Sequence, residues 1–129
     1  MILLDTHVVI WLAQDTDRLS QAAELAIRAA RAEGGGLAIS SLTLFEVAQL
    51  VSRGRLSVQP GLDRFLEELE MLFVIKQLDA RVAMISGRLE NYPRDPVDRL
   101  IGATAIVAGI PLVTADERIR QSGQVQTIW

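Results

Sequence analysis

The chain contains no cysteine, a single histidine and a single lysine. Without cysteine it forms neither disulfide bonds nor zinc–thiolate sites, so a bound metal must use oxygen ligands or His7. A lone histidine next to an acid is more often a positional hydrogen-bond donor than a ligand. No long apolar run is present, and the N-terminal MILLD lacks the basic and apolar regions of a signal peptide. We therefore expect a cytosolic protein with no membrane partner.

Charge is also limited, at 22% of the residues, while half of the chain is hydrophobic. This composition is typical of a folded soluble protein and argues against disorder. The length of 129 residues fits one domain, residues 1–129. The net charge of −3 disfavours a nucleic-acid partner at first sight. If four of the sixteen acids bind a metal, however, thirteen bases face twelve remaining acids, and the rest of the protein is close to neutral. All bases except Lys76 are arginine, which binds phosphate in a bidentate manner.

One stretch, DPVDRLIGATAIVAGIPLVTAD at residues 95–116, combines the patterns of a helix, a turn and a strand. Asp before Pro predicts an N-cap at Asp95 and a helix from Pro96, and the Gly-Ile-Pro sequence at 109–111 predicts its end. A short buried strand then leads to Asp116. Asp98 shares a helix face with Ile101, Gly102 and Ala105, which we expect to press closely against a sheet. Alternatively, Asp98 is only the second half of a capping box.

Short apolar runs alternate with amphipathic patterns along the rest of the chain. This alternation predicts an α/β fold with a parallel sheet covered by helices on both faces. Besides the strand before Asp116, strands are expected at 2–4, 37–39, 73–75 and 125–128. Besides the helix from Pro96, helices are expected after Asp5, at 20–33, from Ser40 or Ser41 to about 53, at 61–72, after Asp79 and at 116–121.

Four acidic residues stand in apolar surroundings at element boundaries. Asp5 and Asp116 follow strands directly, whereas Glu46 and Asp98 lie near the starts of helices. Right-handed crossovers bring the carboxyl ends of parallel strands to one edge of the sheet, so we expect the four acids to meet there. The alternatives are that Asp5 only caps the next helix and that Glu46 lies on a solvated face.

Such a cluster cannot be fully ionised in a low dielectric without a counter-charge. A hard divalent cation supplies that charge, and an all-oxygen site with room for water suits Mg²⁺ or Mn²⁺. The predicted chemistry is metal-assisted hydrolysis of a phosphodiester bond. Asp5 and Asp98 would be the principal ligands, and Asp116 would complete the site. Glu46 would hold a metal-bound water or act as a base.

Residues next to these acids could support the site. Thr6 and Thr114 could orient the acids through hydroxyl hydrogen bonds, although Thr114 also fits a capping box with Glu117. Arg99 and Arg118 could hold a substrate phosphate or could be ordinary surface residues.

The ordered motifs MILLDTHVVIWL, ISSLTLFEVAQLVSRGRL and DPVDRLIGATAIVAGIPLVTAD resemble those of the PIN-domain nucleases, in particular the VapC-type toxins of prokaryotic toxin–antitoxin pairs. The resemblance spans nearly the whole chain and places the four family acids at Asp5, Glu46, Asp98 and Asp116. It implies a three-layer α/β/α sandwich, Mg²⁺- or Mn²⁺-dependent cleavage of RNA, a homodimer, and a cognate antitoxin whose C-terminal tail occupies the active-site groove. Relatives often carry a lysine four residues after the second acid, where this chain has Leu50, which puts a substrate contact by that lysine in doubt.

Two other functions compete with this one. A phosphoacceptor receiver domain should carry paired acids after its first strand and a lysine after its last, whereas Asp5 stands alone here and Lys76 lies elsewhere. A catalytically silent PIN-fold binding module is the second alternative, and the complete set of acids argues against it.

Overall fold

The short apolar runs form the strands of one parallel sheet. The computed structural model describes residues 1–129, and its strands are β1 (Ile2–Leu4), β2 (Leu37–Ser40), β3 (Val74–Lys76), β4 (Leu112–Val113) and β5 (Thr127–Ile128). Every neighbouring pair is parallel, in the order β3-β2-β1-β4-β5. The five predicted strands are confirmed, with ends shifted by one or two residues in most of them.

Helices connect the strands and cover the sheet. They are α1 (Thr6–Gln14), α2 (Gln21–Ala32), α3 (Ser41–Ser52), α4 (Leu62–Leu72), α5 (Ala80–Arg88), α6 (Pro96–Ala108) and α7 (Glu117–Ser122). A short 3-10 helix at Thr16–Arg18 was not predicted. Ser20, Ser40 and Asp79 cap their helices through their side chains, as polar residues at the N-cap do, because they accept hydrogen bonds from free backbone N–H groups. None of the helices combines the length and the apolar character needed to span a membrane.

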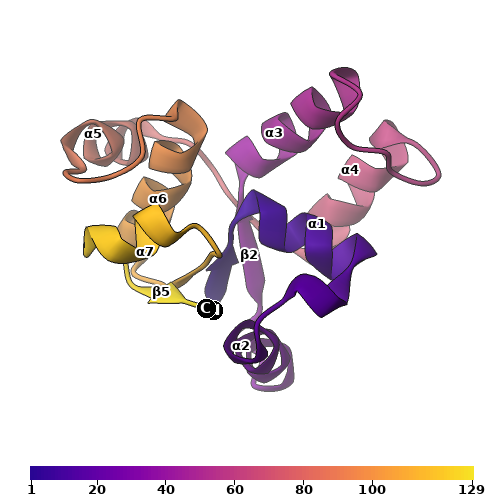
Figure 1. Ribbon diagram of the computed structural model, residues 1–129, viewed down its shortest axis with the longest axis horizontal. Helices are drawn as coiled ribbons and strands as arrows, with labels where there is room; N and C mark the ends of the chain where they lie inside the picture. Colours follow the sequence, from indigo (N-terminus) through magenta and orange to yellow (C-terminus); the bar gives the residue numbers. More distant parts are fainter.

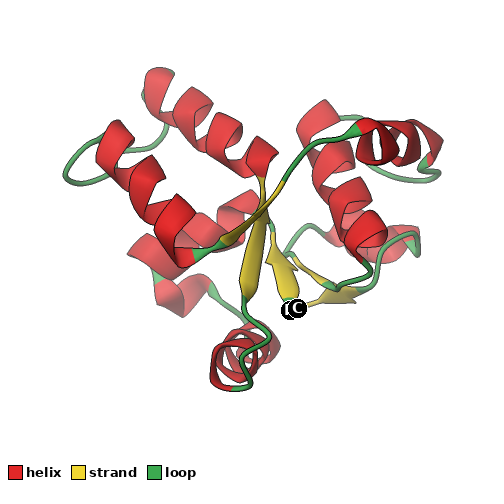
Figure 2. Ribbon diagram, turned by 180° about the vertical axis from the view of Figure 1, so that it is seen from behind, coloured by secondary structure: helices red, strands yellow, loops and turns green.

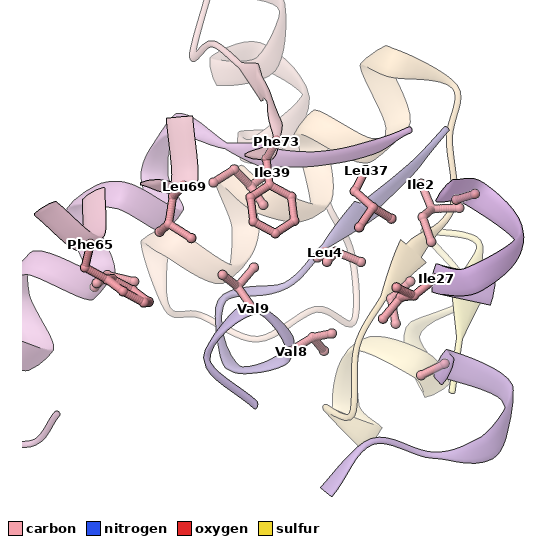
Figure 3. Close-up of a cluster of buried hydrophobic side chains, with 14 of the residues drawn as sticks. Ile2, Leu4, Val8, Val9, Ile27, Leu37, Ile39, Phe65, Leu69 and Phe73 are labelled. Atoms are coloured by element: carbon pink, nitrogen blue, oxygen red, sulfur yellow. The ribbon is translucent and has the colours of Figure 1, made fainter. Parts of the chain in front are cut away.

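The sheet divides the core into two layers, in keeping with the alternation of side chains along a strand. Ile2 and Leu4 of β1 pack with apolar residues of α1 to α4, and Figure 3 shows this cluster around Val9, Ile39 and other labelled side chains. Leu3 lies on the opposite face and packs with residues of α6 and α7 and of the segment after α5. Helices therefore cover both faces, and the architecture is a three-layer α/β/α sandwich (Figures 1 and 2).

The strand order reverses next to β1. The chain runs from β1 outward to β2 and β3 and then crosses to β4 and β5 on the other side. Parallel α/β sheets bind ligands at the carboxyl end of such a reversal, here between β1 and β4. Asp5 lies at this point, and its backbone N–H donates to Val113 O at 3.0 Å. The receiver-like alternative is wrong, because receiver domains have the strand order 2-1-3-4-5.

Candidate metal centre

Three carboxylates converge where the starts of α3 and α6 approach each other, at the carboxyl ends of the central strands (Figure 1). Glu46 comes from the second turn of α3, Asp98 from the first turn of α6, and Asp95 is the N-cap of α6. One oxygen from each of the three lies within 4.8 Å of the others. The structure thus brings together Glu46 and Asp98, two of the four predicted acids, and adds a third.

The sequence predicts Asp95 only as a helix cap, and that role is confirmed. Its Oδ1 accepts the backbone N–H groups of Val97 at 2.9 Å and Asp98 at 3.1 Å, so the N-terminus of α6 is capped by Asp95 and not by a capping box. A carboxylate that caps with one oxygen still has a second oxygen free for a ligand. The spacing Asp-Pro-Val-Asp, with two acids at i and i+3 on one helix turn, was the pattern that could have identified it.

Asp5 is the most buried acid of the group, with an exposed fraction of 3%. Its Oδ1 accepts the Thr6 N–H at 2.8 Å, and its Oδ2 accepts the Thr114 hydroxyl at 2.7 Å. The Thr114 hydroxyl also accepts the Asp116 N–H at 3.1 Å. Asp5 therefore caps α1 and also belongs to a buried hydrogen-bond network, and Thr114 forms no capping box.

The acids of the cluster disfavour one another's ionisation, because they are partly buried and close together. Burial, followed by the nearby charges of Asp5, Asp95, Glu46 and Asp116, raises the pKa of Asp98 to about 7. Burial also raises the pKa of Glu46, with Asp5 and Asp95 adding to the shift and the Thr6 hydroxyl opposing it. Carboxylates that resist ionisation together form a donor set that a hard divalent cation stabilises. The residues present thus fit a divalent metal ion.

Asp116 lies at the margin of this group. It caps α7 by accepting the Arg118 N–H at 2.9 Å, and its Oδ2 is 3.2 Å from Arg118 Nη2. Burial disfavours ionisation of Asp116, but the hydrogen bonds from Arg118 outweigh burial and lower its pKa. Asp116 therefore adds negative potential to the cluster while its own carboxylate is paired with Arg118. Its predicted role as a metal ligand stays a prediction.

Arg99, a candidate phosphate ligand, is hydrogen-bonded within the protein. Its guanidinium donates to three backbone carbonyl oxygens, those of Ser86 at 3.0 Å, Leu89 at 2.8 Å and Pro93 at 3.3 Å. These bonds tie the end of α5 and the segment after it to the first turn of α6. Three of its five N–H groups are therefore used within the protein, and a phosphate contact by Arg99 stays a prediction.

His7 is placed beside Asp5 but is not arranged as a metal ligand. Its Nε2 accepts the Ala115 N–H at 2.9 Å, and its Nδ1 lies 3.7 Å from Asp5 Oδ2. The neutral ring must then carry its proton on Nδ1, facing the carboxylate. His7 thus positions the residues after β4 by accepting a hydrogen bond, whereas the sequence predicted a donor.

Tyr92 was not identified from the sequence, although it is the only tyrosine. Its exposed fraction is 7%, and its buried hydroxyl has no hydrogen-bond partner. Burial, followed by the charges of Asp5, Asp98 and Asp116, raises its pKa. Gly102 makes room for this ring, because a Cβ there would overlap the Tyr92 hydroxyl. The expectation of close packing against the sheet is confirmed for Ile101 and Ala105, which cluster with Leu3 and Leu112, whereas Gly102 faces Tyr92.

Comparisons with known proteins identify the family of this chain. The family model described as "PIN domain" matches residues 2–124. Ribonuclease VapC22 of Mycobacterium tuberculosis is 35% identical over 131 residues, which cover 99% of this chain and 98% of that protein.

Solved structures with the same fold include VapBC2 from Rickettsia felis bound to a DNA fragment from its promoter, with a TM-score of 0.73, 19% identity, and coverage of 98% of this chain and 97% of that chain. FitAcB from Neisseria gonorrhoeae has a TM-score of 0.70 and 22% identity over 98% of this chain and 96% of that chain. At these identities the two structures establish the fold, and the predicted fold class is confirmed. The sequence motifs, the sheet order and the family match lead to one conclusion, namely that this chain belongs to the PIN domain family.

Proposed function

We propose that this protein is a Mg²⁺-dependent endoribonuclease that hydrolyses phosphodiester bonds in RNA, with Mn²⁺ able to replace Mg²⁺. The observation that carries the proposal is the convergence of Glu46, Asp95 and Asp98 within 4.8 Å at the carboxyl ends of the strands. The relative Ribonuclease VapC22 supports the same activity through its name and its near complete coverage of the chain.

The surroundings of each acid indicate which role it would have in the reaction. Asp98, Asp95 and Glu46 would hold the cation together with Asp5, whose orientation is fixed by Thr6 and Thr114. A bound divalent cation polarises a phosphoryl oxygen and lowers the pKa of a coordinated water.

Glu46 lies within the cluster and would use its second carboxylate oxygen to orient the attacking water and accept its proton. Asp116 would become an additional ligand of the cation when Arg118 turns away from its carboxylate. The Arg118 side chain is 72% exposed and is free to do so, and it would then contact a substrate phosphate.

We further propose that the chain acts as the toxin of a toxin–antitoxin pair in the cytoplasm. Residues 1–129 would form a single PIN domain that dimerises with a second copy and binds a cognate antitoxin protein. The support comes from structural neighbours such as VapBC2 from Rickettsia felis, which was solved bound to a DNA fragment from its promoter.

The toxin proposal is tested in cells. Expression of the chain in bacteria should arrest growth, and Asp98→Ala should abolish the arrest. Equal toxicity of Asp98→Ala would contradict a toxic activity based on this site.

The nuclease proposal is tested with purified protein and a labelled single-stranded RNA. Cleavage should require Mg²⁺ or Mn²⁺, should stop with EDTA, and should fall at least about a hundredfold in Asp5→Asn and Asp98→Asn. Asp63→Asn, which removes an exposed acid of α4, is the matched control and should cleave like the unmodified chain. Equal cleavage by all three variants would refute the assignment of the site. Absence of cleavage in the unmodified chain, together with RNA binding, would favour the catalytically silent module.

A further inference from the structure

We propose that a hollow beside the acidic cluster binds the single-stranded RNA that flanks the cleaved bond. In this proposal, Phe45 stacks on a base, and Arg53 and Arg55 bind backbone phosphates. The proposal rests on the ribonuclease function and assigns the part of the substrate that lies outside the cluster.

The hollow has a volume of about 350 Å³ and is continuous with the metal centre, because Glu46 and Asp95 line both. Its other walls include Phe45, Arg53 and Arg55. A polynucleotide whose scissile phosphate lies at the acids must continue along the adjoining surface. The hollow is the place next to the acids where an aromatic ring and two cations line that surface.

The lining residues form an ordered strip along α3. Phe45, Gln49 and Arg53 are spaced by four residues and therefore share one face of the helix, beside Glu46. At 1.5 Å per residue, Arg53 lies about 10 Å from Glu46 along the helix axis. The aromatic ring of Phe45 thus lies level with the acids, and a strand that runs from there toward the C-terminal end of α3 would reach the cations.

Both arginines are free to bind an anion. Arg53 and Arg55 are exposed, and neither forms one of the four ion pairs of the protein. The turn that carries them is held by the backbone, because the Arg55 N–H donates to Leu50 O at 2.8 Å and Gly54 adopts a left-handed conformation with φ of +68°. Two cations on a fixed turn can bind phosphate groups with little ordering of the backbone.

Phe45 presents an aromatic ring to solvent in this polar hollow, with 53% of its surface exposed. Exposed aromatic rings are the common platform for bases of single-stranded RNA, since every base has a face that can stack. An aliphatic side chain of similar size lacks this interaction. Replacing Phe45 by leucine should therefore test stacking separately from apolar burial.

The experiment measures binding of a fluorescein-labelled single-stranded RNA by anisotropy at several salt concentrations, in the non-cleaving Asp98→Asn background. Arg53→Gln and Arg55→Gln should each reduce the dependence of log K on log [salt] by about one, and the double variant by about two. Phe45→Leu should weaken binding about tenfold without changing that slope. Arg81→Gln/Arg88→Gln removes the same number of exposed cations from α5, and it is the control expected to bind normally.

The same substitutions in the cleaving chain give a second readout, in which KM for RNA should rise while kcat is retained. If the unmodified chain cleaves RNA but the Arg53/Arg55 variants keep affinity, salt slope and KM, the subsite is overturned and the nuclease proposal stands. An equal loss in the Arg81/Arg88 control would also overturn it, because the effect would then reflect total charge. A change of oligomeric state with unchanged RNA affinity would reassign the hollow to a contact between copies. If the unmodified chain neither binds nor cleaves RNA, both proposals fail.

Discussion

Neutralising Asp98 should make the metal-free protein more stable at alkaline pH. Burial and four neighbouring acids raise its pKa from 3.8 to about 7, so the folded state binds a proton more tightly than the unfolded state. The stabilisation by this proton is complete below pH 3.8 and is lost as the pH rises through 7. The amide introduced by Asp98→Asn carries no charge at any pH, which removes the repulsion.

The size of the effect follows from the shift and from the exposure of the group. A shift of about three pKa units corresponds to about 4 kcal/mol at most. Asp98 is only half-buried, and solvent screening reduces this to about 2 kcal/mol. For a chain of 129 residues the unfolding entropy is about 0.27 kcal/mol per kelvin, so the melting temperature should rise by about 7 °C.

Thermal unfolding in EDTA, followed by circular dichroism at pH 8 and pH 5, measures this difference. The gain from Asp98→Asn should be full at pH 8 and less than half as large at pH 5, where the unmodified Asp98 is still protonated in the folded state. Mg²⁺ should then stabilise the unmodified chain and have a smaller effect on the variant. A variant that is less stable than the unmodified chain at pH 8, or a gain independent of pH, would refute the electrostatic account of the cluster.

Three further substitutions test individual contacts. Tyr92→Phe should raise the free energy of unfolding in urea by about 1 kcal/mol, because it removes a buried hydroxyl without a partner. Gly102→Ala should cost about 1–3 kcal/mol by overlap with that hydroxyl, and less in the Tyr92→Phe background. Thr114→Val should cost about 2 kcal/mol and weaken Mn²⁺ binding, measured by calorimetry, by about 10- to 100-fold, since it removes the hydrogen bond to Asp5. Unchanged unfolding curves, or Mn²⁺ affinity unaffected in Thr114→Val, would contradict these assignments.

The fold was predictable because its determinants are local. Continuous apolar runs marked the strands, and helix starts were marked by Ser20, Asp79 and the Asp95-Pro96 pair, whose roles depend only on neighbouring backbone groups. The sheet order followed less directly, since it depends on which side of β1 each crossover packs. Family resemblance supplied what local chemistry left open.

The site was predicted less completely because side-chain direction depends on competing partners. Asp116 follows β4 as expected, but its carboxylate pairs with Arg118, two residues later. The spacing of the two residues in the sequence does not tell whether Asp116 binds Arg118 or a metal ion. Arg99 follows Asp98 directly, yet its guanidinium turns toward the carbonyls before α6. Tyr92 carried no recognised motif, and its place beside the acids depends on the space left by Gly102.

The cluster combines one fixed carboxylate with three that lack any cationic partner. Both oxygens of Asp5 are held by hydrogen bonds at the junction of β1 and β4, so its position is set by the sheet itself. Glu46, Asp95 and Asp98 belong to the starts of α3 and α6, and none of them forms an ion pair. A cation would therefore draw Glu46, Asp95 and Asp98 toward Asp5, whose own position is fixed by the sheet. Phe45 and Arg53 are carried by the same helix as Glu46, so closing of the acids around a cation would also move the RNA subsite that we propose.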